Sequence, residues 1–332
     1  MSNAVAGEPR LSFLDERYQF AWDSTSLGAL KECPRKYQLS IQEGWRRKGE
    51  SLHLRYGILY HRALEVYDHK SAEGMDHQTA LRECLRDLAL GCMDETEEVN
   101  AETGEVHTVR TWWKPDHSSK TVPNLFRTVI WYLERFGRND PAQTIILANG
   151  KPGVELSFRF EAGFEIAGQQ ILYSGHLDRV VEFNNLRWGM DRKTTGSSLT
   201  DGSSMRFFDQ FTPDNQMSMY TLALDVAFHV PAQGIIIDAA QIAVGFSRFE
   251  RGFATRTQGQ LEDWHQSNKW WIEQAFRFAD QDYWPMNDKS CDKYGGCPFR
   301  KVCSKDPAVQ YVYLESDFHI QKWDPLRVRG DI

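Results

Sequence analysis

Two predicted strands that meet at a pair of asparagines place two carboxylates side by side. The segments "QILYSGHLDRVVEF" and "LRWGMDRKTT" have strand composition, and Asn184 and Asn185 lie between them. Asparagine tolerates the positive φ angles of a two-residue hairpin turn, and with such a turn Asp178 lies directly opposite Asp191. Their Cβ atoms are then ~4.5 to 5.5 Å apart. A longer loop would shift this register, so the prediction depends on the turn.

Lys193 adds a positive charge to this carboxylate pair, because residues two apart on a strand point to the same face. Two carboxylates this close repel each other unless a cation lies between them, and Mg²⁺ is held by oxygen ligands of this kind. A lysine beside them can orient a water or stabilise charge that develops on a phosphate. The other interpretation is a surface ion pair between Asp191 and Lys193 that contributes little, with Asp178 close by chance. The sequence supports the two interpretations about equally.

The chain changes from helical to strand periodicity near residue 151. Apolar residues at helical spacing predict helices at 24–45, 55–70, 77–93, 122–137, 215–228 and 260–280. Alternating or continuous apolar residues predict strands at 153–161, 170–183, 186–195 and 234–250. We therefore expect an α/β (α+β) fold with a mixed central sheet that helices flank and wrap. The expected organisation is an N-terminal arm (1–23), one domain (24–304) with a helical part (24–140), an insertion loop (94–122), a core (151–250) and a C-terminal helix with a cysteine loop (258–304), and a tail (305–332).

Composition excludes several classes of protein. With 332 residues and a net charge of −7, the chain is not a histone-like basic protein, so any nucleic-acid site must be a local basic patch. No segment approaches the ~18 to 20 apolar residues of a membrane span, and the N-terminus lacks the pattern of a secretory signal. We therefore expect a cytoplasmic protein, whose six cysteines stay reduced and are better explained by metal binding than by disulfides.

Four of the six cysteines fall into two distant segments. Cys33 lies in "KECPRKYQLS", and "SCDKYGGCPFRKVCSK" contains Cys291, Cys297 and Cys303 with five residues in each gap. These gaps are longer than those of paired zinc ligands and of ferredoxin runs. Three evenly spaced cysteines in a loop that contains Gly, Pro and Lys favour a shared metal site over independent buried thiols. The other two cysteines are expected to be ordinary packed thiols of a helix.

The motif "GHLDRVVEF" followed by "GMDRKTTG" resembles the PD-(D/E)XK nuclease superfamily, in which an Asp ends one core strand and Asp/Glu-x-Lys lies on the next. The resemblance implies a restriction-endonuclease-like fold. It also implies that Asp178 and Asp191 bind Mg²⁺ or Mn²⁺, that the backbone carbonyl of Arg192 adds a ligand, and that Lys193 assists the attacking water. Position 191 is Asp where many members have Glu, and both occur in the superfamily.

Two further motifs resemble the RecB-type branch of that superfamily. The segment "YGILYHRALE" matches G-x-x-x-H, which implies that His61 is an imidazole ligand and makes Mn²⁺ a suitable cation. The segment "DNQMSMYTLALDVA" contains Gln-x-x-x-Tyr, which implies that Gln216 and Tyr220 contact the DNA backbone or brace the lysine. Without the resemblance, His61 reads as a packed or solvent-facing residue and Tyr220 as part of the core.

The cysteine pattern resembles the iron–sulfur nucleases, such as the AddB-type nuclease domain and the CRISPR adaptation nuclease family. By that resemblance the four thiolates of Cys33, Cys291, Cys297 and Cys303 hold a [4Fe-4S] cluster that joins the N- and C-terminal parts. The resemblance runs from about residue 24 to 304, and no helicase segment or GxxxxGK[ST] motif accompanies it. It implies a stand-alone, phage-type member of the branch.

The expected function is hydrolysis of DNA phosphodiester bonds by a metal-dependent nuclease, most simply an exonuclease on single strands or DNA ends in recombination, repair or replication. A helicase or recombination protein is the expected partner, and no membrane is involved. The competing interpretations are a catalytically silent DNA-binding module with the same fold and an iron–sulfur redox protein. The segment "PRKYQLSIQEGWRRKGE" places five cations among Tyr37 and Trp45, which suits a single-stranded DNA site or, equally, a solvated helix end.

Overall fold

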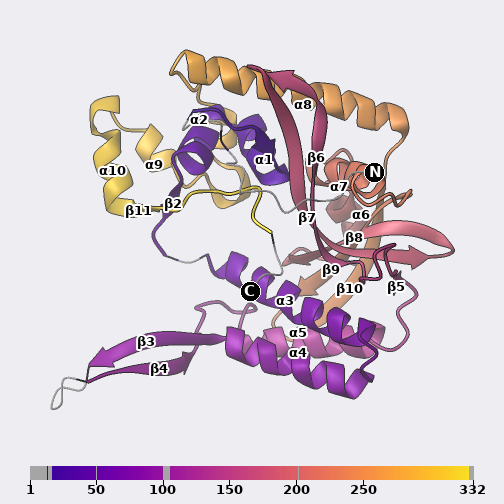
Figure 1. Cartoon of the computed structure of the whole chain (residues 1–332). Helices are drawn as coiled ribbons and strands as arrows, with labels where there is room; N and C mark the ends of the chain where they lie inside the picture. Colours follow the sequence, from indigo (N-terminus) through magenta and orange to yellow (C-terminus); the bar gives the residue numbers. More distant parts are fainter. Residues whose placement is uncertain (1–12, 14–16, 50, 100–104, 201, 329–332) are drawn as a thin grey trace.

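The computed structural model describes residue 13 and residues 17–49, 51–99, 105–200 and 202–328, and it has a mixed sheet at its centre (Figure 1). The strand order is β1-β7-β8-β9-β10, and β5 and β6 both pair with β7. These seven strands are β1 (Ala21–Trp22), β5 (Gln143–Thr144), β6 (Val154–Ile166), β7 (Gln169–Phe183), β8 (Leu186–Thr195), β9 (Gly234–Ile242) and β10 (Ser247–Thr255). The expected mixed sheet with flanking helices is confirmed.

The hairpin between β7 and β8 has the predicted turn. Its ladder runs from Phe183 opposite Leu186 to Arg179 opposite Met190. Both turn residues have positive φ angles, 52° for Asn184 and 60° for Asn185, as a type I′ turn requires. The register is therefore confirmed, and positions 178 and 191 face each other one step beyond the last ladder pair.

Strand β9 lies at the centre of the sheet and is buried along its whole length. It runs parallel to β8, with Asp191 opposite Ile237, and the connection between them contains α6 (Ser203–Asp209) and α7 (Asn215–Val226). The strand predicted at 234–250 is two strands, because a turn closed by the Ala243 N–H and the Phe246 carbonyl separates β9 from β10. The two strands then pair antiparallel.

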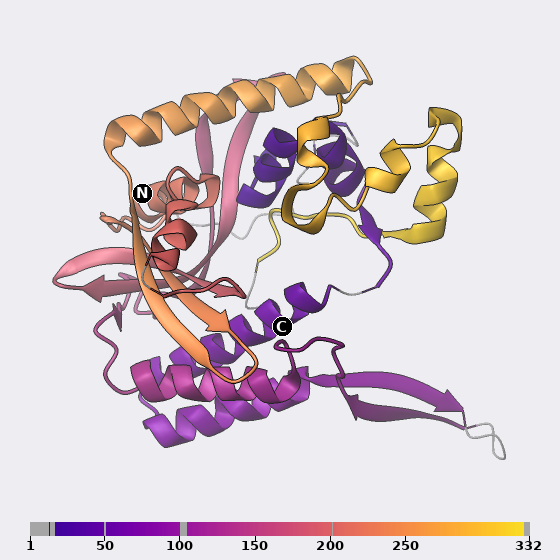
Figure 2. The same ribbon diagram turned by 180° about the vertical axis from the view of Figure 1, so that it is seen from behind.

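Helices cover both faces of the sheet (Figures 1 and 2). One face packs against α1, α7 and α8, with Leu30, Leu224 and Phe276 in a shared core with Leu177. The other face packs against α3, α4 and α5, whose core includes Phe249 of β10. The bounds of these helices are α1 (Ser24–Glu32), α3 (Leu52–Ala72), α4 (His77–Gly91), α5 (Val122–Phe136) and α8 (Gln258–Asp280). These positions confirm the predicted helices from residue 55 to 137 and those near residues 215 and 260.

The helix predicted at 24–45 is interrupted at Cys33. This residue is extended (φ −163°, ψ 114°), because the proline that follows it disfavours helical geometry at the preceding position. After the break the chain forms α2 (Pro34–Tyr37) and a short π-helix (Gln38–Gln42). The interruption places the Cys33 thiol at a junction between helices instead of on a continuous helical face.

The insertion at 94–122, expected to be a loop, contains a β-hairpin that projects from the body of the protein (Figure 1). Strands β3 (Met93–Val99) and β4 (Val106–Trp112) pair antiparallel. Glu95 and Arg110 form a cross-strand ion pair with 2.7 Å between Oε1 and Nε. Most of the described side chains of both strands are exposed, so the hairpin has no apolar alternation by which the sequence could reveal it.

The segment at 305–328, expected to be a tail, is folded. It contains a 3-10 turn (Pro307–Val309), helix α10 (Gln310–Asp317) and strand β11 (Phe318–Ile320). Strand β11 pairs antiparallel with β2 (Trp45–Arg47), so the C-terminal segment packs on the chain that follows Cys33. Two 3-10 turns (Asp288–Ser290 and Lys293–Gly295) and α9 (Arg300–Cys303) complete this part.

At the N-terminal end, the expected arm 1–23 includes β1, which pairs with β7. Residues 1–12 and 14–16 of this arm lie outside the described residues.

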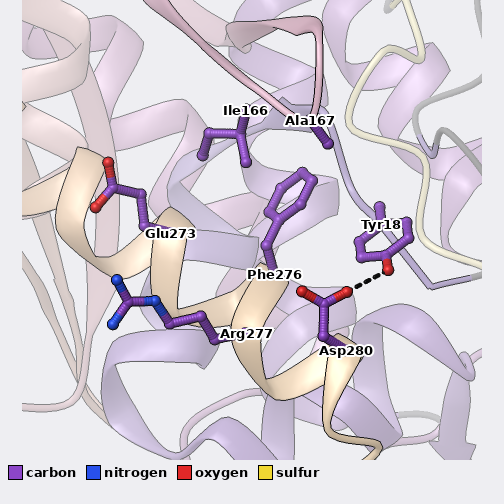
Figure 3. A pocket seen from close by; sticks show the side chains of 7 residues that line it. All are labelled: Tyr18, Ile166, Ala167, Glu273, Phe276, Arg277 and Asp280. Atoms are coloured by element: carbon purple, nitrogen blue, oxygen red, sulfur yellow. Dashed lines mark hydrogen bonds between the residues drawn. The ribbon is translucent and has the colours of Figure 1, made fainter.

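Two further features bear on function. Within the described ranges, no helix is long and apolar enough to cross a membrane. A cavity of about 380 Å³ lies between α8 and the turn that joins β6 and β7 (Figure 3). The Tyr18 hydroxyl donates to Asp280 at its edge, with 2.5 Å between the oxygens. None of the residues that line this cavity is a predicted site residue.

The turn between β7 and β8 generates a testable prediction about stability. Asn185→Val should lower the free energy of unfolding by about 1 to 2 kcal/mol, because a β-branched residue is strained at positive φ. Asn185→Gly should change it by less than about 1 kcal/mol, because glycine adopts this conformation freely. Chemical denaturation of the two variants measures the difference. Equal stabilities would mean that the turn does not set the register.

Candidate metal-binding site at the ends of β7 and β8

Asp178 and Asp191 lie beside each other where the β7–β8 ladder ends. Both are buried, with 6% and 3% of their surfaces exposed. The backbone N–H of Arg192 donates to Asp178 Oδ2 over 2.7 Å, which fixes this carboxylate against the neighbouring strand. The structure therefore brings together the two carboxylates that the hairpin register predicts.

Helix α3 places His61 against the same carboxylate pair. The His61 Nδ1 lies 3.3 Å from Asp178 Oδ2, and 27% of the His61 side chain is exposed. Gly57, one turn earlier, faces the end of β8, since a Cβ built there would lie 3.7 Å from Thr194 Oγ1. Helix α3 therefore lies near the end of β8, and His61 is a partly exposed residue beside Asp178.

Lys193, Gln216 and Tyr220 form a chain of contacts that begins at Asp191. The Lys193 Nζ lies 2.6 Å from Asp191 Oδ2 and donates to Gln216 Oε1 over 2.8 Å. The Gln216 Nε2 then donates to the Tyr220 hydroxyl over 3.0 Å. Helix α7 begins with Asp214 as its N-cap, which places Gln216 in the first turn, and the four-residue spacing puts Tyr220 on the same face. Of the two roles implied for the Gln-x-x-x-Tyr motif, bracing of the lysine matches this geometry.

The two carboxylates have opposite pKa shifts. Burial raises the pKa of Asp191 to about 6, and the neighbouring Asp178 charge also raises it, against the opposing effect of Lys193. For Asp178 burial acts in the same direction, but His61, the Arg192 N–H and Lys193 outweigh it and hold the pKa below its usual value. Near neutral pH both groups are therefore ionised, and the pair carries more negative charge than Lys193 alone can balance.

The donor set fits a hard divalent cation. Asp191 Oδ2 is buried, and its charged partner is Lys193 Nζ, 2.6 Å away. The two buried carboxylates share this one lysine, so a cation between them would balance the remaining negative charge. Within the described ranges, no three His, Cys, Asp or Glu side chains converge closely enough to hold a metal ion. Water or substrate would complete the coordination of a cation bound there, as at many Mg²⁺ sites.

Arg192 contributes to the site through its amide and to the opposite face of the sheet through its side chain. Its guanidinium Nη2 lies 2.5 Å from Asp68 Oδ2 on α3. The predicted contact between its carbonyl and a cation stays a prediction.

Asp68 belongs to a network of three aspartates and three arginines that sequence reasoning missed: Asp68, Asp140, Arg179, Arg192, Asp238 and Arg251. Asp238 within the apolar run "GIIIDAAQI" was the available signal, because a charge in a buried strand needs a partner.

The four predicted cluster cysteines come from both ends of the chain into one region. Burial raises the pKa of Cys303 to about 11, and the nearby thiols of Cys297, Cys33 and Cys291 contribute to the shift. The Asn287 N–H donates to Cys33 Sγ over 3.3 Å. The four sulfurs lie close enough to influence one another, but they do not form a ready metal-binding group. The remaining two cysteines are fully buried in the α3–α5 core, as packed thiols are.

The raised pKa of Asp191 generates a prediction about cation binding and pH. Asp191 keeps its proton to higher pH in the folded protein than in the unfolded chain, so its contribution to stability falls as pH rises from about 4 to about 6. A divalent cation should reverse this loss, because it binds the ionised form. Mn²⁺ at 100 times its Kd at pH 7 should raise the free energy of unfolding by about 2.7 kcal/mol at that pH. The same Mn²⁺ concentration should raise it clearly less at pH 5.

Thermal unfolding with and without Mn²⁺ measures this effect. Asp191→Asn should abolish the cation-dependent shift at both pH values. Asp263→Asn, which removes an exposed carboxylate of α8, should keep it. A shift of wild-type size in Asp191→Asn would place the cation elsewhere.

Comparisons with curated sequences and with solved structures do not identify a family by themselves. No curated protein sequence matches the chain. A solved structure from Eubacterium rectale, named "Putative exonuclease", is 11% identical and has a TM-score of 0.43 over 90% of this chain and 93% of that chain. A second structure, named "SSO0001", is 12% identical and has a TM-score of 0.29 over 55% of this chain and 74% of that chain. At these values neither likeness adds to the assignment.

The family comparison covers most of the chain. Residues 22–304 match the model of the PD-(D/E)XK nuclease superfamily. The matched range contains both carboxylates, the lysine, the histidine and the four cysteines described above. The chain therefore belongs to the PD-(D/E)XK nuclease superfamily.

Proposed function

We propose that this protein is a metal-dependent deoxyribonuclease, most simply an exonuclease on single-stranded DNA or DNA ends. The observation that carries the proposal is the complete and braced set of Asp178, Asp191 and Lys193 at the ends of two neighbouring strands. The expected setting is recombination, repair or replication in the cytoplasm of a bacterium or a phage-infected host, with a helicase or recombination protein as partner.

The proposed cation site uses the carboxylates of Asp178 and Asp191, with the His61 imidazole and the Arg192 carbonyl as further ligands. A Mg²⁺ or Mn²⁺ ion bound there would activate a water and polarise the scissile phosphate. Imidazole suits Mn²⁺ better than Mg²⁺, so His61 favours Mn²⁺. Both carboxylates are buried, so their electrostatic attraction for a bound ion would be stronger than at an exposed site.

Lys193 acts as a fixed positive charge in this proposal. Burial lowers its pKa, but the adjacent Asp191 outweighs burial and raises the pKa above its ordinary value. The side chain therefore stays protonated at neutral pH and cannot serve as a general base. It can instead orient the attacking water or stabilise negative charge on the phosphate, and Gln216 holds it in place for either task.

The two competing functions account for less of the structure. A catalytically silent DNA-binding module would not need both carboxylates and the lysine, and all three are present, with Lys193 in contact with Asp191. An iron–sulfur redox protein would give no role to Asp178 or Lys193. The nuclease proposal uses every member of this set.

We also propose that Cys33, Cys291, Cys297 and Cys303 hold a [4Fe-4S] cluster. The support is the proximity of the four sulfurs and the small core shared by the chain after Cys33 and the cysteine loop, which includes Trp45 and Phe299. A cluster would link segments separated by 257 residues and so restrict the unfolded chain. Its main effect would be on stability.

The primary test of the proposal is cleavage. Wild type with Mn²⁺ or Mg²⁺ should degrade end-labelled DNA, and Lys193→Met should lower the rate by at least ~10²-fold, because a charge that stabilises the transition state is lost. Cation binding by Lys193→Met should stay intact or become slightly tighter. Lys151→Ala, which removes an exposed lysine, should cut like wild type. Near wild-type cleavage by Lys193→Met would make Lys193 a simple ion-pair residue.

The cluster is tested separately by metal content. Protein purified without oxygen should be brown and contain about four irons per chain, the content of one [4Fe-4S] cluster. Cys33→Ala should lose iron and melt at lower temperature. Cys84→Ala leaves a cavity in the α3–α5 core, so it should also lower stability but retain the iron. A colourless wild-type protein with stoichiometric zinc would contradict the cluster.

A further inference from the structure

A groove of about 410 Å³ lies between α1, β2 and the cysteine loop. Helix α1 forms its floor through residues such as Ser24 and Gly28. The cysteine loop contributes Pro298 and Phe299, and β2 contributes Arg46 and Arg47.

The groove has an excess of positive charge in a protein that is negative overall. Its one carboxylate, Glu32, is neutralised by Lys36, with 2.7 Å between Oε2 and Nζ. In the part of the chain that the structure describes, no carboxylate forms an ion pair with Arg46 or Arg47. The Arg46 guanidinium lies 5.7 Å from the centre of the Trp323 ring, and burial lowers its pKa. A partly desolvated guanidinium without a counterion favours an anionic ligand.

The floor of the groove lets a ligand approach the backbone of α1. No atom lies within 4 Å of a Cβ built at Gly28, so this side of the helix is open. The groove volume is near the lower end of the range for small-molecule sites, which suits a short stretch of one strand and is too small for a duplex. Tyr37 and Trp45, with 1% and 6% of their surfaces exposed, are packed in cores and cannot stack on bases. The two aromatic residues of the segment that suited a single-stranded DNA site are therefore closed to bases, and recognition here would be by charge.

Hydrogen bonds connect the groove to the candidate catalytic site. Asn215 Nδ2 donates to the carbonyl of Ser24 on the groove floor over 3.4 Å. Lys31 Nζ donates to Asn215 Oδ1 over 3.2 Å. The residue after Asn215 is Gln216, which binds Lys193. The groove floor and the residue that holds Lys193 are therefore linked through Asn215.

We infer that this groove binds the sugar–phosphate backbone of single-stranded DNA next to the cleavage site, without regard to base sequence. The inference rests on the proposed nuclease function and adds a location and a mode of substrate binding to it. Arg46 and Arg47 contact phosphates, and the small residues of α1 leave room for the chain. Binding is consequently sensitive to salt, because each neutralised phosphate releases counterions.

The test measures binding of a labelled oligo(dT) in EDTA, where no metal-dependent cleavage occurs. Arg47→Glu should weaken binding at least about 5-fold and lower the magnitude of the slope of log K against log salt by about 0.7 to 1. Gly28→Glu, which places a carboxylate in open space on the groove floor, should also weaken binding. Gly28→Ala should bind like wild type and be slightly more stable, because alanine favours the helix.

The controls separate the groove from general charge effects. Arg187→Glu makes the same charge change at an exposed arginine at the other end of β8, and it should bind like wild type. If Arg47→Glu and Gly28→Glu bind oligo(dT) as tightly as wild type, the groove is not the DNA path, whatever the cleavage result. Duplex DNA bound as tightly as oligo(dT), with the same loss in these variants, would overturn the single-strand assignment. Inorganic phosphate that displaces the oligonucleotide at equal phosphate concentration would show a free-anion site instead.

The result is independent of the proposed chemistry. If wild type does not cut DNA but the groove variants lose binding, the nuclease proposal is wrong and the groove is the DNA-binding site. If wild type cuts DNA but the groove variants bind normally, the nuclease proposal holds and the groove is not the DNA-binding site. Equal melting temperatures of wild type and Arg47→Glu would show that lost binding is not lost folding.

Discussion

The buried ion pair between Arg192 and Asp68 couples the two faces of the sheet, with 2.5 Å between Nη2 and Oδ2. On one face, the Arg192 guanidinium holds α3 against the strands. On the other face, the amide of the same residue donates to Asp178. His61 lies seven residues before Asp68, which is two helical turns on the same face of α3. The ion pair and the 3.3 Å contact between His61 Nδ1 and Asp178 Oδ2 therefore come from the same side of α3.

The charges on the two faces of the sheet are balanced differently. Beneath the sheet, three aspartates and three arginines neutralise one another, and the Tyr132 hydroxyl also donates to Asp238. Removing one member would leave an uncompensated buried charge, which typically costs several kcal/mol. Above the sheet, Asp178 and Asp191 share one lysine. The balanced network stabilises the scaffold, whereas the excess negative charge of the site would suit a cation.

Local patterns in the sequence predict the parts of the site that depend on one turn or one helix. Two asparagines fix the register of Asp178 and Asp191, and helical spacing places Gln216 and Tyr220 on one face. Features that depend on distant residues could not be predicted. The pairing of β2 with β11 joins strands about 270 residues apart and has no local signature, and nothing near Asp68 in the sequence indicates an ion pair with Arg192. The break at Cys33 was readable from Pro34, but the apolar pattern of the helix concealed it.

Helix α1 connects the cysteine region to α7, whose Gln216 contacts Lys193. At its C-terminal end, Asn287 Nδ2 and Ser290 Oγ of the cysteine loop donate to the carbonyl of Glu32 over 2.8 and 2.6 Å. These bonds satisfy a carbonyl that the helix itself leaves unpaired. At its N-terminal end, α1 binds Asn215, the neighbour of Gln216. The helix is thus held by the cysteine loop at one end and by α7 at the other. A series of contacts therefore runs from the cysteine loop through α1 and Asn215 to Gln216 and Lys193.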